Sequence, residues 1–243
     1  MLLTGTLLNV ATVLAGTTIG LLAGARVPPR MQESLTTALG FFTLVLGLSM
    51  ALPIFTSPDA LPGDDLAILS GLLLGTAVGE ALRLHDGLEA IGAWFQARLA
   101  PEGLGSRIAE GFVTASLVFC VGPLTILGSL ENGLTGDLSL LATKSLLDGV
   151  ASIAFAATLG AGVYLAAITV LLVQGGIAAF AFLLRDVMDP RTILAVTSVG
   201  GLLLLGIALR LLALKSVRVA NFLPALVLAP LLVRVADVIR GLL

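Results

Sequence analysis

Lys144 and Asp148 are the two charged residues that most clearly suggest chemistry in this sequence. They lie four residues apart in an apolar stretch, so on a helix they share one face and can form an ion pair. Charged groups within a membrane are costly and usually functional. Two interpretations stay open: a gate or a proton- or ion-coupled switch, and a static pair that fixes helix packing.

Four further apolar segments each carry a polar side chain, at Asn9, Glu80, Gln174 and Asn221. We expect these side chains, together with the charged pair, to line the path of a small solute or ion. Polar side chains also form ordinary hydrogen bonds between membrane helices, worth only about 1 kcal/mol each. Glu80 lies near the end of its segment, so it could instead extend towards water.

Gly122 and Pro123 interrupt another apolar segment, directly after Cys120. Proline removes a backbone donor, and the adjacent glycine favours a bend or a break. In lipid a freed carbonyl must find a partner or line a wet cavity, and many transporters build their binding sites from broken helices. A packing kink is the alternative, and Cys120 is expected to be a small apolar filler.

The composition places these residues in a membrane protein. Residues of the AVILMFWYC set make up 58%, charged residues 12%, and mean hydropathy is +1.11, whereas about a quarter of an ordinary soluble chain is charged. A net charge of −2 gives no basic field for nucleic acid. A single cysteine and a single histidine, His85, argue against a disulfide framework or a metal centre, and we expect no cofactor.

Segments of about 20 apolar residues can cross a bilayer core of about 30 Å. Eight such segments are predicted, at residues 2–25, 35–55, 66–84, 108–130, 138–159, 161–184, 193–214 and 219–239. Residues 85–99 mix apolar and charged side chains and predict a short amphipathic helix in the interface, with Trp94 at headgroup level. We therefore predict an all-α integral membrane protein, with residues 1–243 forming a single transmembrane domain.

Basic residues in the loops predict the orientation. With eight spans, most loop arginines and lysines fall on one side, the cytoplasm, so both termini are expected outside it. The exception is the loop that carries Arg185 and Arg191, which also holds Asp186 and Asp189.

The two ends of the chain resemble each other weakly. The stretch Val10–Leu14 aligns with Ala167–Leu171, and Thr37–Gly40 aligns with Thr197–Gly200. The sequence thus suggests two inverted three-helix repeats, at 1–84 and 161–243, joined by central helices at 108–159, an arrangement found in many secondary transporters. Chance similarity between apolar helices is the alternative.

The run from Gly111 to Gly149, the step Gln174-Gly175 and the run Val219-Ala220-Asn221-Phe222-Leu223-Pro224 resemble a bacterial membrane family. It is the family known as domain of unknown function 554. The opening Gly5-Thr6-Leu7-Leu8-Asn9 is similar to the start of that family. The resemblance covers essentially the whole chain and implies a multi-pass protein of the bacterial inner membrane, but it brings no substrate or catalytic residue.

We expect a small transporter or channel that contacts lipid and an unidentified solute or ion. An enzyme is not expected, because the sequence has no GxSxG, HExxH or Walker motif. A scaffold or regulatory subunit that transports nothing is the main alternative. The glycine pairs Gly16 with Gly20 and Gly71 with Gly75 are spaced as in helix dimers, so a homo-oligomer is a further expectation, although this spacing more often serves contacts within one subunit.

Overall fold

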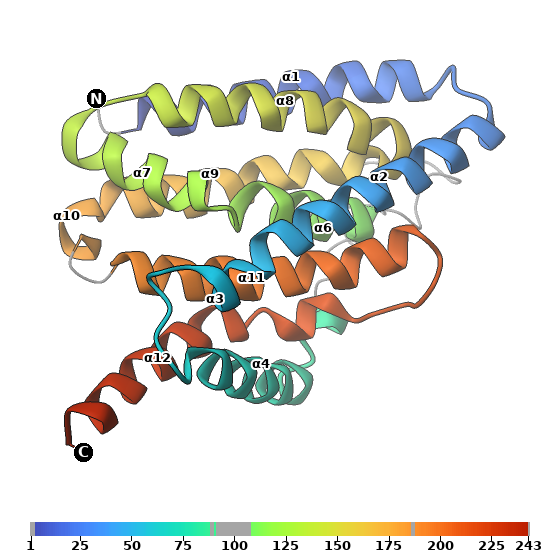
Figure 1. Ribbon diagram of the computed structural model, residues 1–243. Coiled ribbons are helices and arrows are strands. Elements are labelled where there is room, and N and C mark those ends of the chain that lie inside the picture. The colour runs from blue at the N-terminus through green and yellow to red at the C-terminus, as the bar shows by residue number, and fades with distance from the viewer. Residues whose placement is uncertain (1–2, 88–89, 91–107, 186–187, 243) are drawn as a thin grey trace. The chain divides into compact units, whose positions relative to one another are not determined.

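The computed structural model describes residues 3–87, 90, 108–185 and 188–242, and all regular structure within these residues is helical. The helices are α1 (Thr4–Gly24), α2 (Pro29–Ala51), α3 (Pro53–Thr56), α4 (Asp64–Ala81), α6 (Ile108–Cys120), α7 (Pro123–Thr135), α8 (Ser139–Leu159), α9 (Val163–Ala179), α10 (Ala181–Leu184), α11 (Pro190–Leu211) and α12 (Ala225–Leu242), with 3₁₀ turns η2 (Gly160–Gly162) and η3 (Val219–Phe222) (Figure 1). Most of the predicted interfacial helix at 85–99, including Trp94, lies outside the described residues.

Several of these helices are suited to crossing a membrane. Five stretches of the described chain are long and apolar enough: Thr4–Gly24, Arg30–Thr56, Ser139–Ala179, Pro190–Leu211 and Val219–Asp237. The pair α6 and α7, bent by 59°, makes a sixth if it forms one span. The prediction of an all-α membrane protein is therefore confirmed.

The predicted number of eight spans needs two further conditions. The stretch Ser139–Ala179 has 41 residues and contains both α8 and α9, and Figure 1 shows the chain turning back between them. These two helices would have to count separately. In addition α4, which carries Asp64, Asp65 and Glu80, would have to cross the membrane, so the number eight stays a prediction.

The surface of the chain is apolar, as expected for helices that face lipid. Large apolar side chains that are more than half exposed occur on most of the long helices: Leu7, Leu22, Phe41, Val45, Leu73, Leu146, Val150, Leu172 and Val227. At the same time several amides, hydroxyls and charged groups are buried. Apolar side chains thus cover the surface as well as filling the core, which suits a solvent that cannot form hydrogen bonds.

The chain forms two compact units. Unit 1 consists of Met1–Gly40 and Glu89–Arg185, and unit 2 of Phe41–Leu88 and Asp186–Leu243.

In unit 1, glycines bring α1 against α8. Three glycines of α1, spaced four residues apart, face backbone atoms spaced four residues apart along α8: Gly16 faces Gly149, Gly20 faces Ile153 and Gly24 faces Ala157. Because each pair is separated by the same 133 positions in the chain, the two helices run in the same direction. The absent side chains allow the backbones to approach closely.

The broken pair α6–α7 follows α9 from end to end. Ile108 contacts Gly162, the Ser116 hydroxyl donates a hydrogen bond of 3.0 Å to Thr169, and Gly133 contacts Ala178. The break lies at Gly122, whose backbone is extended. There the Thr125 hydroxyl donates a hydrogen bond of 2.9 Å to the Phe119 carbonyl, which satisfies one of the groups that the break releases.

In unit 2, a second glycine stripe brings α4 against η3 and α12. The contacts are Gly71 with Ala229, Gly75 with Ala225 and Gly79 with Asn221. Residue numbers rise along α4 while those of the partners fall, so α4 and α12 are antiparallel. Both glycine pairs noted in the sequence are thus used within the chain. The predicted repeat would make α1 equivalent to α9 and α4 equivalent to α12; both pairs are in contact, while the repeat itself stays a prediction.

Candidate functional site

A polar cluster in unit 1 unites four of the six predicted pathway residues. Asp148 of α8 forms an ion pair with Lys144, one turn earlier on the same helix. It also accepts a hydrogen bond of 2.8 Å from the Asn9 side-chain amide of α1. The same amide donates to Gln174 Oε1 of α9 at 3.1 Å. These contacts therefore connect three helices, with Asn9 of α1 bonded to both Asp148 of α8 and Gln174 of α9.

The cluster is buried between these three helices. Asn9 and Gln174 have no exposed surface, and Lys144 and Asp148 are 4% and 6% exposed. Asp148 is the tenth of the 21 residues of α8. An ion pair at this depth is costly to desolvate, and the hydrogen bond from the Asn9 amide offsets part of that cost at the Asp148 carboxylate.

Two atoms of this cluster have no hydrogen-bond partner among the described residues: Asn9 Oδ1 and Gln174 Nε2. Their orientations are fixed by their neighbours. Turning the Asn9 amide over would place its oxygen against the Asp148 carboxylate and the Gln174 oxygen. One acceptor and one donor are therefore left open, and each buried open group costs about 1–3 kcal/mol.

Further unpaired polar groups lie around the first turns of α1. Within the described chain, the hydroxyls of Thr6 and Ser129 and both amide atoms of Asn132 have no partner. Asn132 Oδ1 lies 3.3 Å from the Cβ position of Gly5. Sequence analysis missed Asn132, because the fourth apolar segment was expected to end at residue 130, whereas α7 continues to Thr135.

The helix break lies beside the cluster. Cys120, the last residue of α6, is buried as expected, and α6 packs against α8, the helix that carries the pair. The structure thus brings the predicted break at Gly122 and Pro123 to the same part of unit 1 as the predicted charged pair.

The other two predicted residues lie together in unit 2. The Glu80 carboxylate accepts hydrogen bonds from the Asn221 amide and from Arg218, the latter at 3.0 Å. Asn221 Oδ1 accepts from the His85 backbone amide at 2.8 Å. The side chains of Glu80 and Arg218 are more than half exposed, so this group caps the end of α4 and does not form a buried site.

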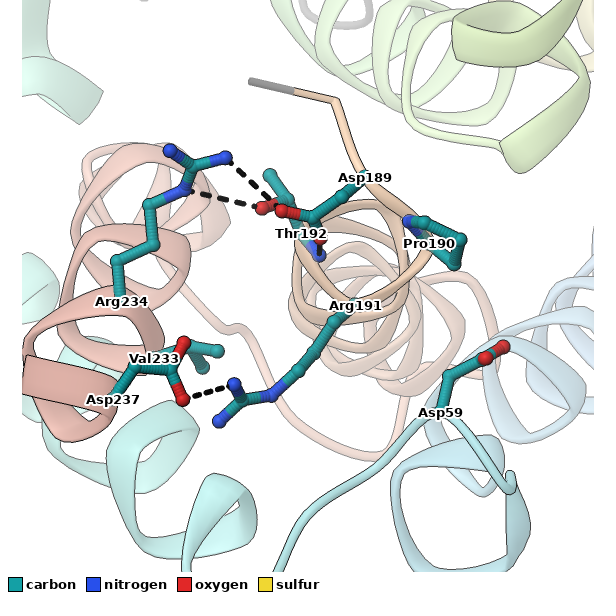
Figure 2. Close-up of a pocket in the computed structure, with 8 residues that line it drawn as sticks. All are labelled: Asp59, Asp189, Pro190, Arg191, Thr192, Val233, Arg234 and Asp237. Atoms are coloured by element: carbon teal, nitrogen blue, oxygen red, sulfur yellow. Dashed lines mark hydrogen bonds and ion pairs between the residues drawn. The ribbon is translucent and has the colours of Figure 1, made fainter. Parts of the chain in front are cut away.

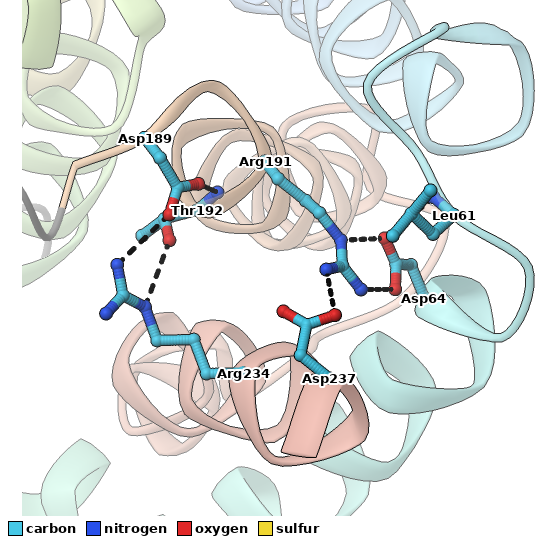
Figure 3. A network of polar contacts seen from close by, with 7 residues as sticks. All are labelled: Leu61, Asp64, Asp189, Arg191, Thr192, Arg234 and Asp237. Atoms are coloured by element: carbon cyan, nitrogen blue, oxygen red, sulfur yellow. Dashed lines mark hydrogen bonds and ion pairs between the residues drawn. The ribbon is translucent and has the colours of Figure 1, made fainter. Parts of the chain in front are cut away.

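A charged network that sequence analysis missed joins α4, α11 and α12 in unit 2 (Figure 3). Arg191, at the start of α11, lies between two carboxylates. Its guanidinium makes two hydrogen bonds to Asp64, one of them at 2.5 Å, and another to Asp237. Such two-pronged contacts are the strongest that arginine makes with carboxylates.

This network gives a physical reason for the exception found among the basic loop residues. The charge of Arg191 is neutralised by two aspartates, of which Asp64 is almost completely buried. The sequence does contain a signal that Arg191 belongs to a helix. The segment Asp189-Pro190-Arg191-Thr192 is typical of a helix start, with an aspartate as the cap and a proline at the first position. The Asp189 side chain does accept a hydrogen bond of 2.7 Å from the Thr192 backbone amide.

Next to this network is a pocket of about 330 Å³. Figure 2 shows its lining residues: Asp59, Asp189, Pro190, Arg191, Thr192, Val233, Arg234 and Asp237. Arg234 donates to Asp189 at 3.1 Å and to the Thr192 hydroxyl at 3.4 Å. Both arginines of the pocket are thus engaged by neighbouring side chains, and the described residues contain no group of three or more histidines, cysteines or acidic residues that could hold a metal ion.

Comparison with known proteins gives a consistent classification. Residues 4–234 match a family described as protein of unknown function (DUF554). The chain is 32% identical over 231 residues to the uncharacterized membrane protein YdfK of Bacillus subtilis, covering 94% of this chain and 95% of the relative. It is also 32% identical over 230 residues to the uncharacterized protein YqgA of Escherichia coli, covering 93% and 94%. No solved structure matches the chain.

Proposed function

This chain belongs to the DUF554 family, and we propose that it is a small transporter or channel for a polar solute, acting in the bacterial inner membrane. The proposed binding site is the cluster of Asn9, Lys144, Asp148 and Gln174 in unit 1. The observation that carries the proposal is the pair of buried, unpartnered amide atoms beside the ion pair.

A purely structural ion pair would not require those open atoms. Interhelical contacts serve packing best when every buried polar atom has a partner. Here the cluster contains a complete ion pair, yet the oxygen of the Asn9 amide and the nitrogen of the Gln174 amide lack a partner within the described chain. A bound solute, or water that a solute displaces, satisfies them, and this supports a site over a static lock.

The break between α6 and α7 supports a role in movement. A continuous helix resists bending because its backbone hydrogen bonds would have to break, but at Gly122 that ladder is already interrupted. The buried cluster has no open route to water in the described conformation, as its four members are at most 6% exposed. Since both α6 and α7 pack against α8, bending at the break between them is a means to open a route to the pair.

Ligand-dependent stability tests the proposal. The purified protein would be heated in detergent with a broad panel of ions, carboxylates, amines, amino acids and nucleosides. A ligand that binds only the folded state raises the melting temperature by mass action. The parent would be compared with Lys144→Ala, Asp148→Ala and the doubly neutral variant Lys144→Met/Asp148→Asn.

The matched control is Thr143→Ala, since Thr143 is on α8 beside Lys144 but is exposed and bonds only to its own helix in the contacts described. We expect a shift in the parent and in the control, and none in the three cluster variants. A compound that gives the shift would then be tested for uptake into proteoliposomes. If no compound shifts the parent, or if the doubly neutral variant responds like the parent, the proposed site is wrong.

A further inference from the structure

The buried cluster has no net charge. Among the three helices that form it, α1 and α9 contain no charged residue, and α8 contains only Lys144 and Asp148. An ion that entered such a site alone would leave one charge uncompensated in a medium of low dielectric constant, which is strongly unfavourable. The cluster is therefore suited to a solute whose own charges sum to zero.

The groups of the cluster are of two chemical kinds. Lys144 Nζ and the open Gln174 Nε2 are donors and suit an anionic group. The Asp148 carboxylate and the open Asn9 Oδ1 are acceptors and suit a cationic group. The unpartnered atoms thus add one donor and one acceptor to those of the ion pair.

From these two properties we infer that the solute is a small zwitterion that carries one carboxylate and one ammonium group, as a free amino acid does. This inference rests on the proposed function and names its substrate class. The carboxylate accepts hydrogen bonds from Lys144 and Gln174, and the ammonium donates to Asp148 and Asn9. The internal ion pair is exchanged for two pairs with the solute, so the site stays neutral throughout.

A lone cation would act differently at the same residues. It would compete with Lys144 for Asp148 and leave the ammonium of Lys144 buried without its partner. A lone carboxylate would in the same way separate Lys144 from Asp148. Both are disfavoured by the burial of the pair, and this difference makes the inference testable with small compounds.

The test compares glycine and L-alanine with their separate halves. Melting temperature would be measured in detergent with each amino acid, with acetate, with methylammonium and with both of these together. Glycerophosphoethanolamine is a further arm, because it is the zwitterionic headgroup of a common bilayer lipid and separates a lipid source from a free solute. We expect a concentration-dependent rise with an amino acid, and little or none with the other compounds.

Two variants assign the halves of the site. Gln174→Met removes the donor to the carboxylate, and Asn9→Leu removes the acceptor of the ammonium. Each should raise the concentration needed for half of the shift about tenfold or more, as expected for the loss of a hydrogen bond to a charged group. Thr143→Ala should leave it unchanged.

Other outcomes would overturn the inference in distinguishable ways. If acetate or methylammonium alone stabilises the protein as well as an amino acid does, the substrate class is wrong, while a Lys144-dependent shift would keep the proposed function. If only glycerophosphoethanolamine stabilises, the ligand is a lipid headgroup. If no compound of the broad panel stabilises the parent, the inference and the proposed function fail together, and water fills the open positions.

Discussion

Asn9 of α1 donates a hydrogen bond of 2.8 Å to the Asp148 carboxylate of α8, although 139 positions separate the two residues in the chain. This contact joins two helices at the one place where a charged pair is buried between them. It also orients the Asn9 amide so that its oxygen stays open.

Asn9→Leu should therefore destabilise the protein. The substitution removes a hydrogen bond to a charged group, a loss of about 1.5–3 kcal/mol, and leaves Gln174 Oε1 without the donor described above. The free energy of unfolding would be measured by reversible denaturation in mixed micelles. Thr143→Ala, at an exposed position, should change it by less than about 0.5 kcal/mol, and equal effects of the two substitutions would contradict the assigned role of Asn9.

Gly20→Ala should disrupt the contact between α1 and α8. A Cβ atom at Gly20 would collide with the Ile153 carbonyl oxygen and would lie 2.8 Å from the Cβ of Ala156, so one helix must move. The matched control is Gly176→Ala in α9, where nothing lies within 4 Å of the added atom. Since alanine favours helix more than glycine by about 1 kcal/mol, the control should keep or raise the melting temperature while Gly20→Ala lowers it.

Arg191→Ala should be one of the more destabilising substitutions in unit 2. It leaves the Asp64 carboxylate, whose side chain is 1% exposed, without its guanidinium partner, and removing one member of a buried pair costs about 3–5 kcal/mol. Arg234→Ala breaks a pair whose members are 41% and 47% exposed, for which about 1 kcal/mol or less is expected.

A double-mutant cycle checks this difference. Unfolding would be measured for Arg191→Ala, Asp64→Ala and the variant with both changes, and the two positions should show strong coupling. The effect of Arg234→Ala should also shrink with added salt, because exposed pairs are screened. Independent effects at Arg191 and Asp64 would contradict the network drawn in Figure 3.

The directions of the helices bear on the number of spans. Since α6–α7 accompanies α9 along its whole length, it crosses the membrane if α9 does. Since α1 and α8 run in the same direction, an odd number of crossings must separate them. With α2 and α6–α7 as two of these, α4 is needed as the third, which leads to eight crossings when α8 and α9 are counted separately.

Thiol labelling tests this number. Cys120 is the only cysteine, so a Cys120→Ala background allows single cysteines to be placed at Ser57 and Ser216. Five crossings would lie between these positions, and the predicted orientation places residue 57 outside the cytoplasm. An impermeant maleimide should label Ser57→Cys in intact spheroplasts and Ser216→Cys only after lysis. Labelling of both positions from the same side would exclude eight spans, and reversed labelling would invert the orientation.

Much of the local structure could be predicted from the sequence. Apolar stretches of sufficient length predicted the long helices, and the four-residue spacing of Lys144 and Asp148 predicted their pairing, because both signals act within a few helical turns. Gly122 and Pro123 likewise indicated the break, since their backbone properties are local.

The assembly of the site could not be predicted in this way. Asn9 and Gln174 join Asp148 from different helices, and no local pattern decides which faces of apolar helices meet. For the same reason Glu80 and Asn221, expected on one path with the other four, lie in a separate group in unit 2. The sequence indicates only a loop charge at Arg191, because its partners Asp64 and Asp237 are far from it in the chain.

The constant separation between three glycines of α1 and their partners on α8 has a consequence for biosynthesis. When α1 enters the membrane, the backbone that will cover Gly16, Gly20 and Gly24 has yet to be made, and its last part is Ala157. At about 5–20 residues per second, the ribosome needs on the order of ten seconds to produce it. During that interval the uncovered glycines of α1 and the Asn9 amide must be shielded by lipid, by the insertion machinery or by a helix of the same chain that is made before α8.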